Sequence, residues 1–149
     1  MIDRGPITTA VRAMLVTATG RPCGLGSLPL VDGRPASLPY TVLYPLGGSV
    51  SGAPFADTAE DAHLTYQVTV VAARVDQAEW LADRVRRAFL RRTPSGAWEC
   101  ELAIPGVDVW RRYLAADQAE VAPGSEVITF AQQYEFDVSE LVTKPGVPS

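Results

Sequence analysis

The side chains that could carry acid-base, nucleophilic or metal chemistry are few and far apart. His63 is the only histidine of the chain, and Cys23 and Cys100 are its only cysteines. A zinc site needs several such ligands, and a Ser-His-Asp triad would need His63 as its base. We therefore expect no metal, no cofactor and no catalytic centre. His63 is expected on the surface of a strand, and the two thiols as small hydrophobic residues without a disulfide.

Short motifs of phosphate, dinucleotide and hydrolase sites are also absent. The Gly-Gly-Ser-Val-Ser run at 47–51 lacks the last glycine of a nucleophile elbow. The Gly-Leu-Gly run at 24–26 follows a helical pattern, whereas a dinucleotide fingerprint follows a strand. Glu99 and Glu101 could share one face of a strand, but no partner residue accompanies them, and a solvated edge is the better interpretation. The sequence predicts a protein that is not an enzyme.

A cluster of arginines is the one marked charge feature. Its members are Arg84, Arg86, Arg87, Arg91 and Arg92. They could form a solvated helix face whose last turn suits the helix dipole. They could also form a docking surface for an acidic partner, since arginine pairs well with carboxylates and Trp80 would add a rigid anchor. The sequence leaves both interpretations open.

Composition restricts the class of protein further. The 149 residues fit one domain, and 13 basic against 17 acidic side chains give a net charge of −4. A general nucleic-acid binder would need a basic excess to neutralise phosphates. No apolar run has the length of a signal peptide core or of a membrane span, so neither is expected.

The periodicity of apolar residues predicts two helices and several strands. The helices are expected at 7–19 and 76–92, and the strands at 38–46, 62–74, 98–104, 107–122 and 127–138. Asp76 is a candidate N-cap of the second helix, with Glu79 completing a capping box. Pro39 and Pro45 favour a position at the sheet edge for the first strand, and the fourth strand is expected to bend near Asp117.

The connections and the fold class follow from the same pattern. Residues 21–39 predict a loop or loose hairpin, 47–61 a long flexible loop, Pro123-Gly124 a turn and 143–149 a loose tail. In 62–74 apolar and polar residues alternate, which is typical of a sheet covered on one side only. We expect a single α+β domain over residues 1–142, with a mostly antiparallel or mixed sheet and two helices packed on one face, followed by a flexible tail over 143–149.

Three stretches of the sequence resemble segments of a known protein family. They are Leu-Pro-Tyr-Thr-Val-Leu-Tyr-Pro-Leu-Gly-Gly at 38–48, Leu-Thr-Tyr-Gln-Val-Thr at 64–69 and Gln-Ala-Glu-Trp-Leu-Ala-Asp-Arg-Val-Arg at 77–86. In these stretches the chain resembles the tail terminators of long-tailed (siphovirus) phages, especially phages of actinobacterial hosts. The resemblance covers about residues 38–92, with a looser likeness in the order of elements elsewhere.

The resemblance implies a structural virion protein made in the host cytoplasm. Such a protein forms a ring, six-fold in the family, on the last ring of tail-tube protein. It ends polymerisation of the tube and joins the tail to head-completion or neck proteins. The implied partners are copies of the chain, tail-tube protein and neck proteins. No membrane and no specific nucleic acid is implied, although DNA would pass through the ring, and the family carries no catalytic residues.

Residues expected at interfaces come from the loop and from the second helix. They are Gly47, Gly48, Ser49, Asp57, Glu60, Asp61, Trp80, Arg84, Arg87 and Arg91. We expect the loop at 47–61 to become ordered on contact with the tube or a neighbouring subunit. Another neck component, namely a head-closure or tail-completion protein, is the main alternative function. A cellular binding module and an enzyme of unrecognised type are the others.

Overall fold

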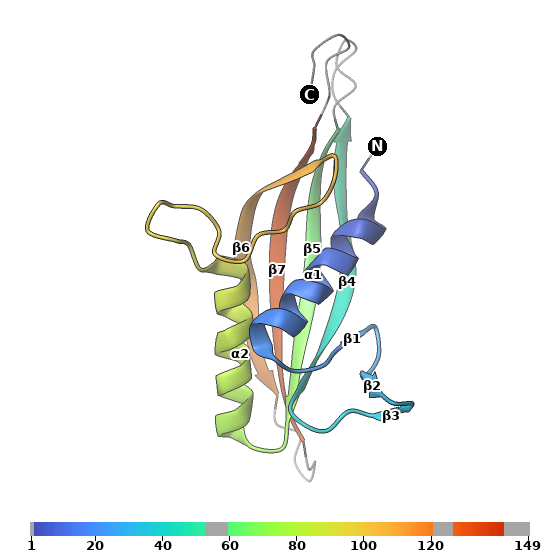
Figure 1. The fold of residues 1–149 in the computed structure, drawn as a ribbon, viewed down its shortest axis with the longest axis vertical. Coiled ribbons are helices and arrows are strands. Elements are labelled where there is room, and N and C mark those ends of the chain that lie inside the picture. Colours follow the sequence, from blue (N-terminus) through green and yellow to red (C-terminus); the bar gives the residue numbers. More distant parts are fainter. Residues whose placement is uncertain (1, 53–59, 121–126, 142–149) are drawn as a thin grey trace.

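A computed structural model describes residues 2–52, 60–120 and 127–141 of the chain. The helices are α1 (Arg4–Thr19) and α2 (Val75–Leu90). The strands are β1 (Cys23–Leu25), β2 (Leu30–Val31), β3 (Arg34–Pro35), β4 (Tyr40–Gly52), β5 (Glu60–Ala72), β6 (Val107–Glu120) and β7 (Ile128–Glu140). Figure 1 shows how they are arranged.

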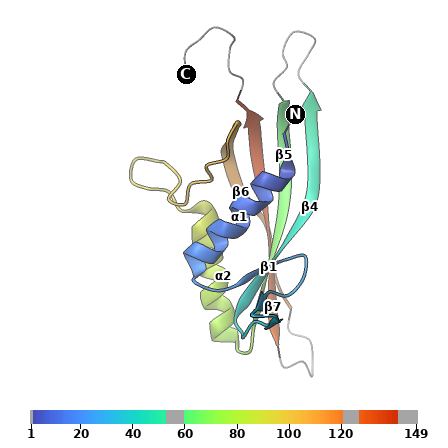
Figure 2. The ribbon, with the colours of Figure 1, turned by 45° about the vertical axis from the view of Figure 1, so that its right-hand side comes forward.

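Five strands form one sheet in the order β1-β4-β5-β7-β6. Only β1 and β4 are parallel, and the remaining pairs are antiparallel. Both helices lie on the same face of the sheet: α1 crosses it diagonally, and α2 lies along its margin beside β6 (Figures 1 and 2). The short strands β2 and β3 form a separate hairpin. The predicted α+β fold with two helices on one face is confirmed.

The hydrophobic core lies between this face and the two helices. In β5 the residues with even numbers point inward, and Leu64, Tyr66, Val68 and Val70 are buried as their alternation predicts. α1 contributes an apolar stripe at helical spacing, and α2 contributes a second. The ring of Phe89 in α2 stacks on that of Tyr134 in β7 with 4.0 Å between the centroids.

The opposite face of the sheet carries no helix in the described part of the chain (Figure 2). His63, Thr65, Gln67 and Thr69 of β5 lie on this outer face, half exposed, as expected. This side of the sheet, opposite the helices, is called the outer face. Neither α1 nor α2 is long and apolar enough to cross a membrane.

The long loop predicted at 47–61 is wrong at both of its ends. β4 continues to Gly52 and β5 begins at Glu60, so the two strands stay paired as far as Gly52 and Glu60. Main-chain hydrogen bonds hold this ladder, and they do not depend on apolar side chains. A bulge between Pro45 and Gly47 accommodates the proline. Residues 53–59 lie outside the described part.

The expected edge position of the first strand holds for part of its length. β1 pairs with β4 only from Thr41 to Leu43. Beyond Leu43 no strand of the described chain lies on that side of β4. Pro45 has no N–H to donate, and it is tolerated here because no strand on that side needs the hydrogen bond.

The start of the second helix was also predicted incorrectly. Arg74 is the N-cap residue of α2, and no side chain caps the helix. Asp76 lies in the first turn instead, where its carboxylate pairs with the Arg74 guanidinium at 3.1 Å. A carboxylate in the first turn still favours the helix through its dipole. The helix ends at Leu90, two residues before the predicted end.

Residues 98–104 do not form the predicted strand. The segment makes only isolated bridges, between Arg92 and Trp98 and between Ile104 and Val107. β6 runs from Val107 to Glu120 with two register shifts, the second between Leu114 and Ala116, just before the bend expected near Asp117. The turn expected at Pro123-Gly124 and the tail at 143–149 lie outside the described residues.

A buried arginine holds residues 91–106 against the sheet. Arg112 points inward from β6 and is 5% exposed. Its Nη1 donates to the carbonyl of Cys100 at 2.8 Å and to that of Phe89 at 3.3 Å. The guanidinium groups of Arg92 and Arg112 both lie over the indole of Trp98, at 3.9 and 4.7 Å from the ring centroid. Burial lowers the pKa of Arg112 to about 10, so the group stays charged at neutral pH.

Replacing this arginine should destabilise the fold far more than replacing its exposed neighbour. In Arg112→Met the carbonyls of Phe89 and Cys100 lose their donor, which costs about 2 kcal/mol or more of unfolding free energy. Arg111→Met removes an exposed pairing and should cost less than about 1 kcal/mol. Urea denaturation of both variants measures the difference, and equal losses would contradict the structural role of Arg112.

Candidate interaction surfaces

Four of the residues predicted at an interface lie along one side of α2 and at its C-terminal end. Trp80, Arg84 and Arg87 follow each other at spacings of four and three residues, which places them on one side of the helix. Arg91 is the C-cap residue after Leu90 and borders the same hollow as Arg84 and Arg87. We call these four residues the arginine flank. The Arg84 guanidinium lies over the Trp80 ring, 4.6 Å from its centroid, and Trp80 is 44% exposed.

The arginine flank borders a hollow of about 330 Å³ on the side of α2 that faces α1. Ala18 at the end of α1, Ala88 and Cys100 contribute to its walls. Arg91 pairs with the Glu99 carboxylate at 3.3 Å. Glu99 therefore has an ion-pair partner, in place of the fully solvated edge expected for it, while Arg84 and Arg87 form no ion pair within the described residues.

The other predicted interface residues do not join the arginine flank. Those that the structure describes belong to the paired strands β4 and β5, toward the ends at Gly52 and Glu60, whereas α2 begins beyond the opposite end of β5 (Figure 1). β5 spans thirteen residues, about 40 Å of strand, from the end paired with β4 at Gly52 to the end that leads into α2. The strand residues and the arginine flank therefore belong to two separate surfaces.

Within this second set the structure describes five positions, by side-chain contacts, backbone conformation or strand register. Gly47 has a φ of +87° at the bulge, and a Cβ at Gly48 would collide with the carbonyl oxygen of His63. Asp61 is exposed and accepts a hydrogen bond from the Ser139 hydroxyl at 2.7 Å. Ser49 lies opposite His63 in the ladder. Glu60 is the first residue of β5, paired with Gly52, and Asp57 lies outside the described residues.

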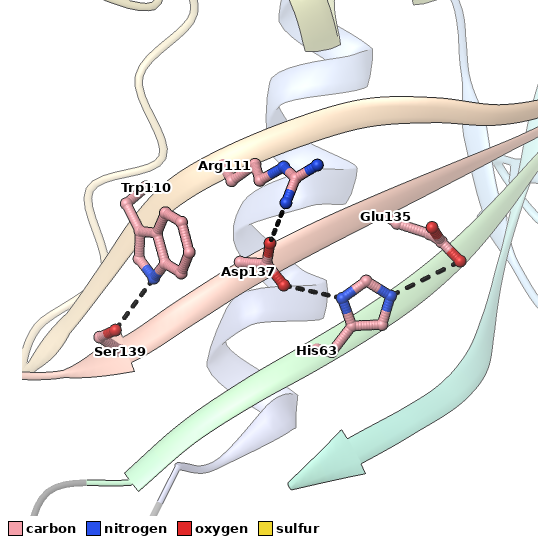
Figure 3. Close-up of polar contacts among 6 residues, drawn as sticks. All are labelled: His63, Trp110, Arg111, Glu135, Asp137 and Ser139. Carbon is pink, nitrogen blue, oxygen red and sulfur yellow. Dashed lines mark hydrogen bonds and ion pairs between the residues drawn. The ribbon is translucent and has the colours of Figure 1, made fainter. Parts of the chain in front are cut away.

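The outer face carries a polar network that the sequence analysis missed (Figure 3). His63 Nδ1 donates to the Asp137 carboxylate at 2.7 Å, and His63 Nε2 lies 3.5 Å from the Glu135 carboxylate. Arg111 approaches the other oxygen of Asp137 at 3.6 Å. Three neighbouring strands, β5, β7 and β6, supply these side chains. Glu135 and Asp137 share one face of β7 by their spacing, but only the strand register shows that His63 and Arg111 lie beside them.

The network favours the charged form of its histidine. The hydrogen bond to Asp137 is the main cause that raises the pKa of His63, and partial burial opposes it. The hydrogen bond of Tyr113 to Glu135 likewise raises the pKa of the phenol. The network holds charge in a fixed arrangement, which suits surface recognition. Among the described residues no group of three or more His, Cys, Asp or Glu side chains is placed to hold a metal ion.

Trp110 is the largest apolar side chain on this part of the surface. It is the extra residue of the first β6 bulge, between Val109 and Arg111, and it is 51% exposed. Its indole Nε1 donates to the Ser139 hydroxyl at 2.9 Å (Figure 3). Ser139 in turn donates to the Asp61 carboxylate at 2.7 Å. An exposed indole fixed by a hydrogen bond is a suitable anchor for a protein partner.

The comparisons with known proteins yield a shared fold. No protein-family model matches the chain, and no curated protein is found similar to it. A chain in a solved structure described as "Virion of native gene transfer agent (GTA) particle" superposes with a TM-score of 0.56 at 15% sequence identity. The match covers 89% of this chain and 91% of that chain. The two chains thus share a fold over nearly their whole lengths.

The single histidine makes the outer-face network measurable. Its imidazole should give one titrating NMR signal, with a pKa above the ordinary value of 6.5. Asp137→Asn removes the main stabilising partner and should lower that pKa, whereas Asp108→Asn, at an exposed position outside the network, should leave it unchanged.

The same shift predicts how stability depends on pH. Because the pKa is raised in the folded state, the contribution of His63 is fully present below the unfolded pKa and is lost as pH rises through the folded pKa. His63→Gln should therefore lower the melting temperature more at about pH 5.5 than at about pH 8.5. An equal loss at both values would contradict a charged His63.

Proposed function

We propose that this chain is a structural subunit of a phage or phage-like virion and acts as the terminator ring at the end of a tail tube. The observation that carries the proposal is the likeness of fold, over nine-tenths of both chains, to a chain from a gene transfer agent virion. The sequence resemblance to tail terminators at residues 38–92 supports the same function independently of the fold.

The surfaces of the chain support this function because they offer several places that suit binding. The titratable side chains of the outer face bind one another, and Trp80 and Trp110 are exposed on different elements. A subunit that contacts tube, neck and neighbouring copies at once needs several distinct surfaces. The arginine flank and the outer face provide two.

In this function no covalent bond is made or broken. The subunit binds the last ring of the tube by complementary shape and charge, and its other surfaces are then offered to neck proteins. Polymerisation stops because the exposed side of the new ring differs from that of the tube. Its partners are copies of itself, tail-tube protein and head-completion proteins, and its location is the tail end of the virion, after synthesis in the host cytoplasm.

Deletion of the gene tests the proposal by electron microscopy of the resulting particles. Without the terminator we expect overlong tails or tails detached from heads, because nothing ends tube growth or links the tube to the neck. Supplying the wild-type chain from a plasmid should restore tails of uniform length.

Two other results would contradict the terminator function in different ways. Tails of normal length beside empty or leaking heads would assign the chain to head closure. Particles with tails of normal length joined firmly to filled heads would show that it has no function in the neck.

A further inference from the structure

The two flanks of α2 carry opposite charge. The arginine flank faces α1, as described above. On the other side Glu79 and Asp83, four residues apart, share a face with each other and lie near Asp117 of β6. We call Glu79, Asp83 and Asp117 the acidic flank. Since successive helical residues are rotated by about 100°, the adjacent residues Glu79 and Trp80 lie on different sides of the helix.

The acidic flank surrounds a hollow of about 400 Å³ between α2 and strands β6 and β7. Ala82, Arg86, Phe130 and Gln132 complete its lining, so three carboxylates and one guanidinium surround the hollow. Phe130 is partly buried and packs against the core, so its ring offers apolar surface. A long cationic side chain fits such a place well, because its stem can pack on the ring while its charge meets the carboxylates.

The charges of both flanks are largely unused within the subunit. Glu79 and Asp117 form no ion pair in the described part of the chain, and Asp83 only approaches Arg86 at 3.8 Å, where both are exposed. Arg84 and Arg87 also have no carboxylate partner there. On the outer face, in contrast, Asp137 and Glu135 already bind His63 and Arg111. Free charge of both signs is therefore concentrated beside α2.

We propose that the arginine flank of one copy docks against the acidic flank of the next copy around a ring. The inference rests on the proposed ring function and assigns its subunit contact. A ring needs a heterologous contact, in which two different surfaces of the same chain meet. The two flanks are different, opposite in charge and both accessible, since α2 lies at the margin of the fold (Figure 1).

A second copy fits these surfaces better than an unrelated partner does, because one chain carries both halves of the match. Arg84 and Arg87 would meet Glu79, Asp83 and Asp117 of the neighbour. Trp80, exposed beside the arginines, would supply the apolar anchor that interface centres favour. Charge complementarity would also fix the relative orientation of neighbouring subunits, because two arginine flanks or two acidic flanks repel each other.

Charge reversal on each flank tests the contact. One variant carries Arg84→Glu and Arg87→Glu, and the other carries Glu79→Arg and Asp83→Arg. All four positions are exposed on α2, so circular dichroism and the melting temperature should stay close to wild type. The assay counts ring-capped tube ends by electron microscopy after each purified variant is mixed with tail tubes. Each variant alone should cap about tenfold fewer ends than wild type, because like charges meet.

Complementation then distinguishes this contact from any other effect of the mutations. A one-to-one mixture of the two variants should restore capping, since alternating subunits pair opposite charges at every contact of a ring with an even number of subunits. The chain that carries all four substitutions should also restore capping, because both flanks are reversed together. The matched control, Arg4→Glu with Arg34→Glu, changes two exposed arginines away from α2 and should cap normally.

The results separate this inference from the proposed function. If wild type caps tubes and both single-flank variants cap them equally well, the ring exists but the flanks do not form its contact. If both variants fail and neither the mixture nor the combined variant recovers, the flanks do not meet each other. If the wild-type chain itself caps no tubes, the proposed function fails before the contact is tested.

Discussion

The structure depends on one constraint: both helices pack on the same face of the sheet, so a single sheet must be apolar on one side and polar on the other. β5 shows this most clearly, because Leu64, Tyr66 and Val68 are buried while His63, Thr65 and Gln67 alternate with them on the outer face. A strand in this position can hold charged groups at no cost to the core. The His63 network exists because of that freedom.

The same arrangement leaves the segment at the margin of the helical layer without a strand of its own. Residues 91–106 join α2 to β6 without a strand of their own, and their polar main chain has to be satisfied near the core. Arg112 does this from β6, with its charge shared between two carbonyls and the ring of Trp98. The Arg112 side chain thus donates hydrogen bonds to main-chain carbonyls here, as a neighbouring strand would if residues 98–104 formed the predicted strand.

The helix at the margin also explains why the candidate function lies in surfaces. The buried stripe of α2 occupies one side of the helix and leaves two flanks, one beside α1 and one beside β6 and β7. Each flank meets a different part of the fold, so each gains a different hollow and a different set of charges. A chain built this way presents two unlike surfaces, as the proposed ring would require of its members.

The sequence by itself determined the features that depend on local periodicity. The spacing of apolar residues gave both helices, the inward side of β5 and the one-sided covering of the sheet, because these follow from the helical period of 3.6 and the strand period of 2. It also placed Trp80, Arg84 and Arg87 on one side of a helix, since residues three and four apart share a helical face, whereas Arg91 follows the end of the helix as its C-cap residue.

Only the tertiary structure decided what depends on contacts between distant residues. The pairing of β4 with β5 as far as Gly52 and Glu60 depends on main-chain hydrogen bonds, which side-chain patterns do not reveal. The register of β5, β7 and β6 brings His63 to Asp137, although 74 positions separate them in the chain. Asp117 lies near Glu79 beside α2 for the same reason. A sequence pattern indicates which residues share a face of one helix or strand, whereas the packing of the elements determines which of these faces come into contact.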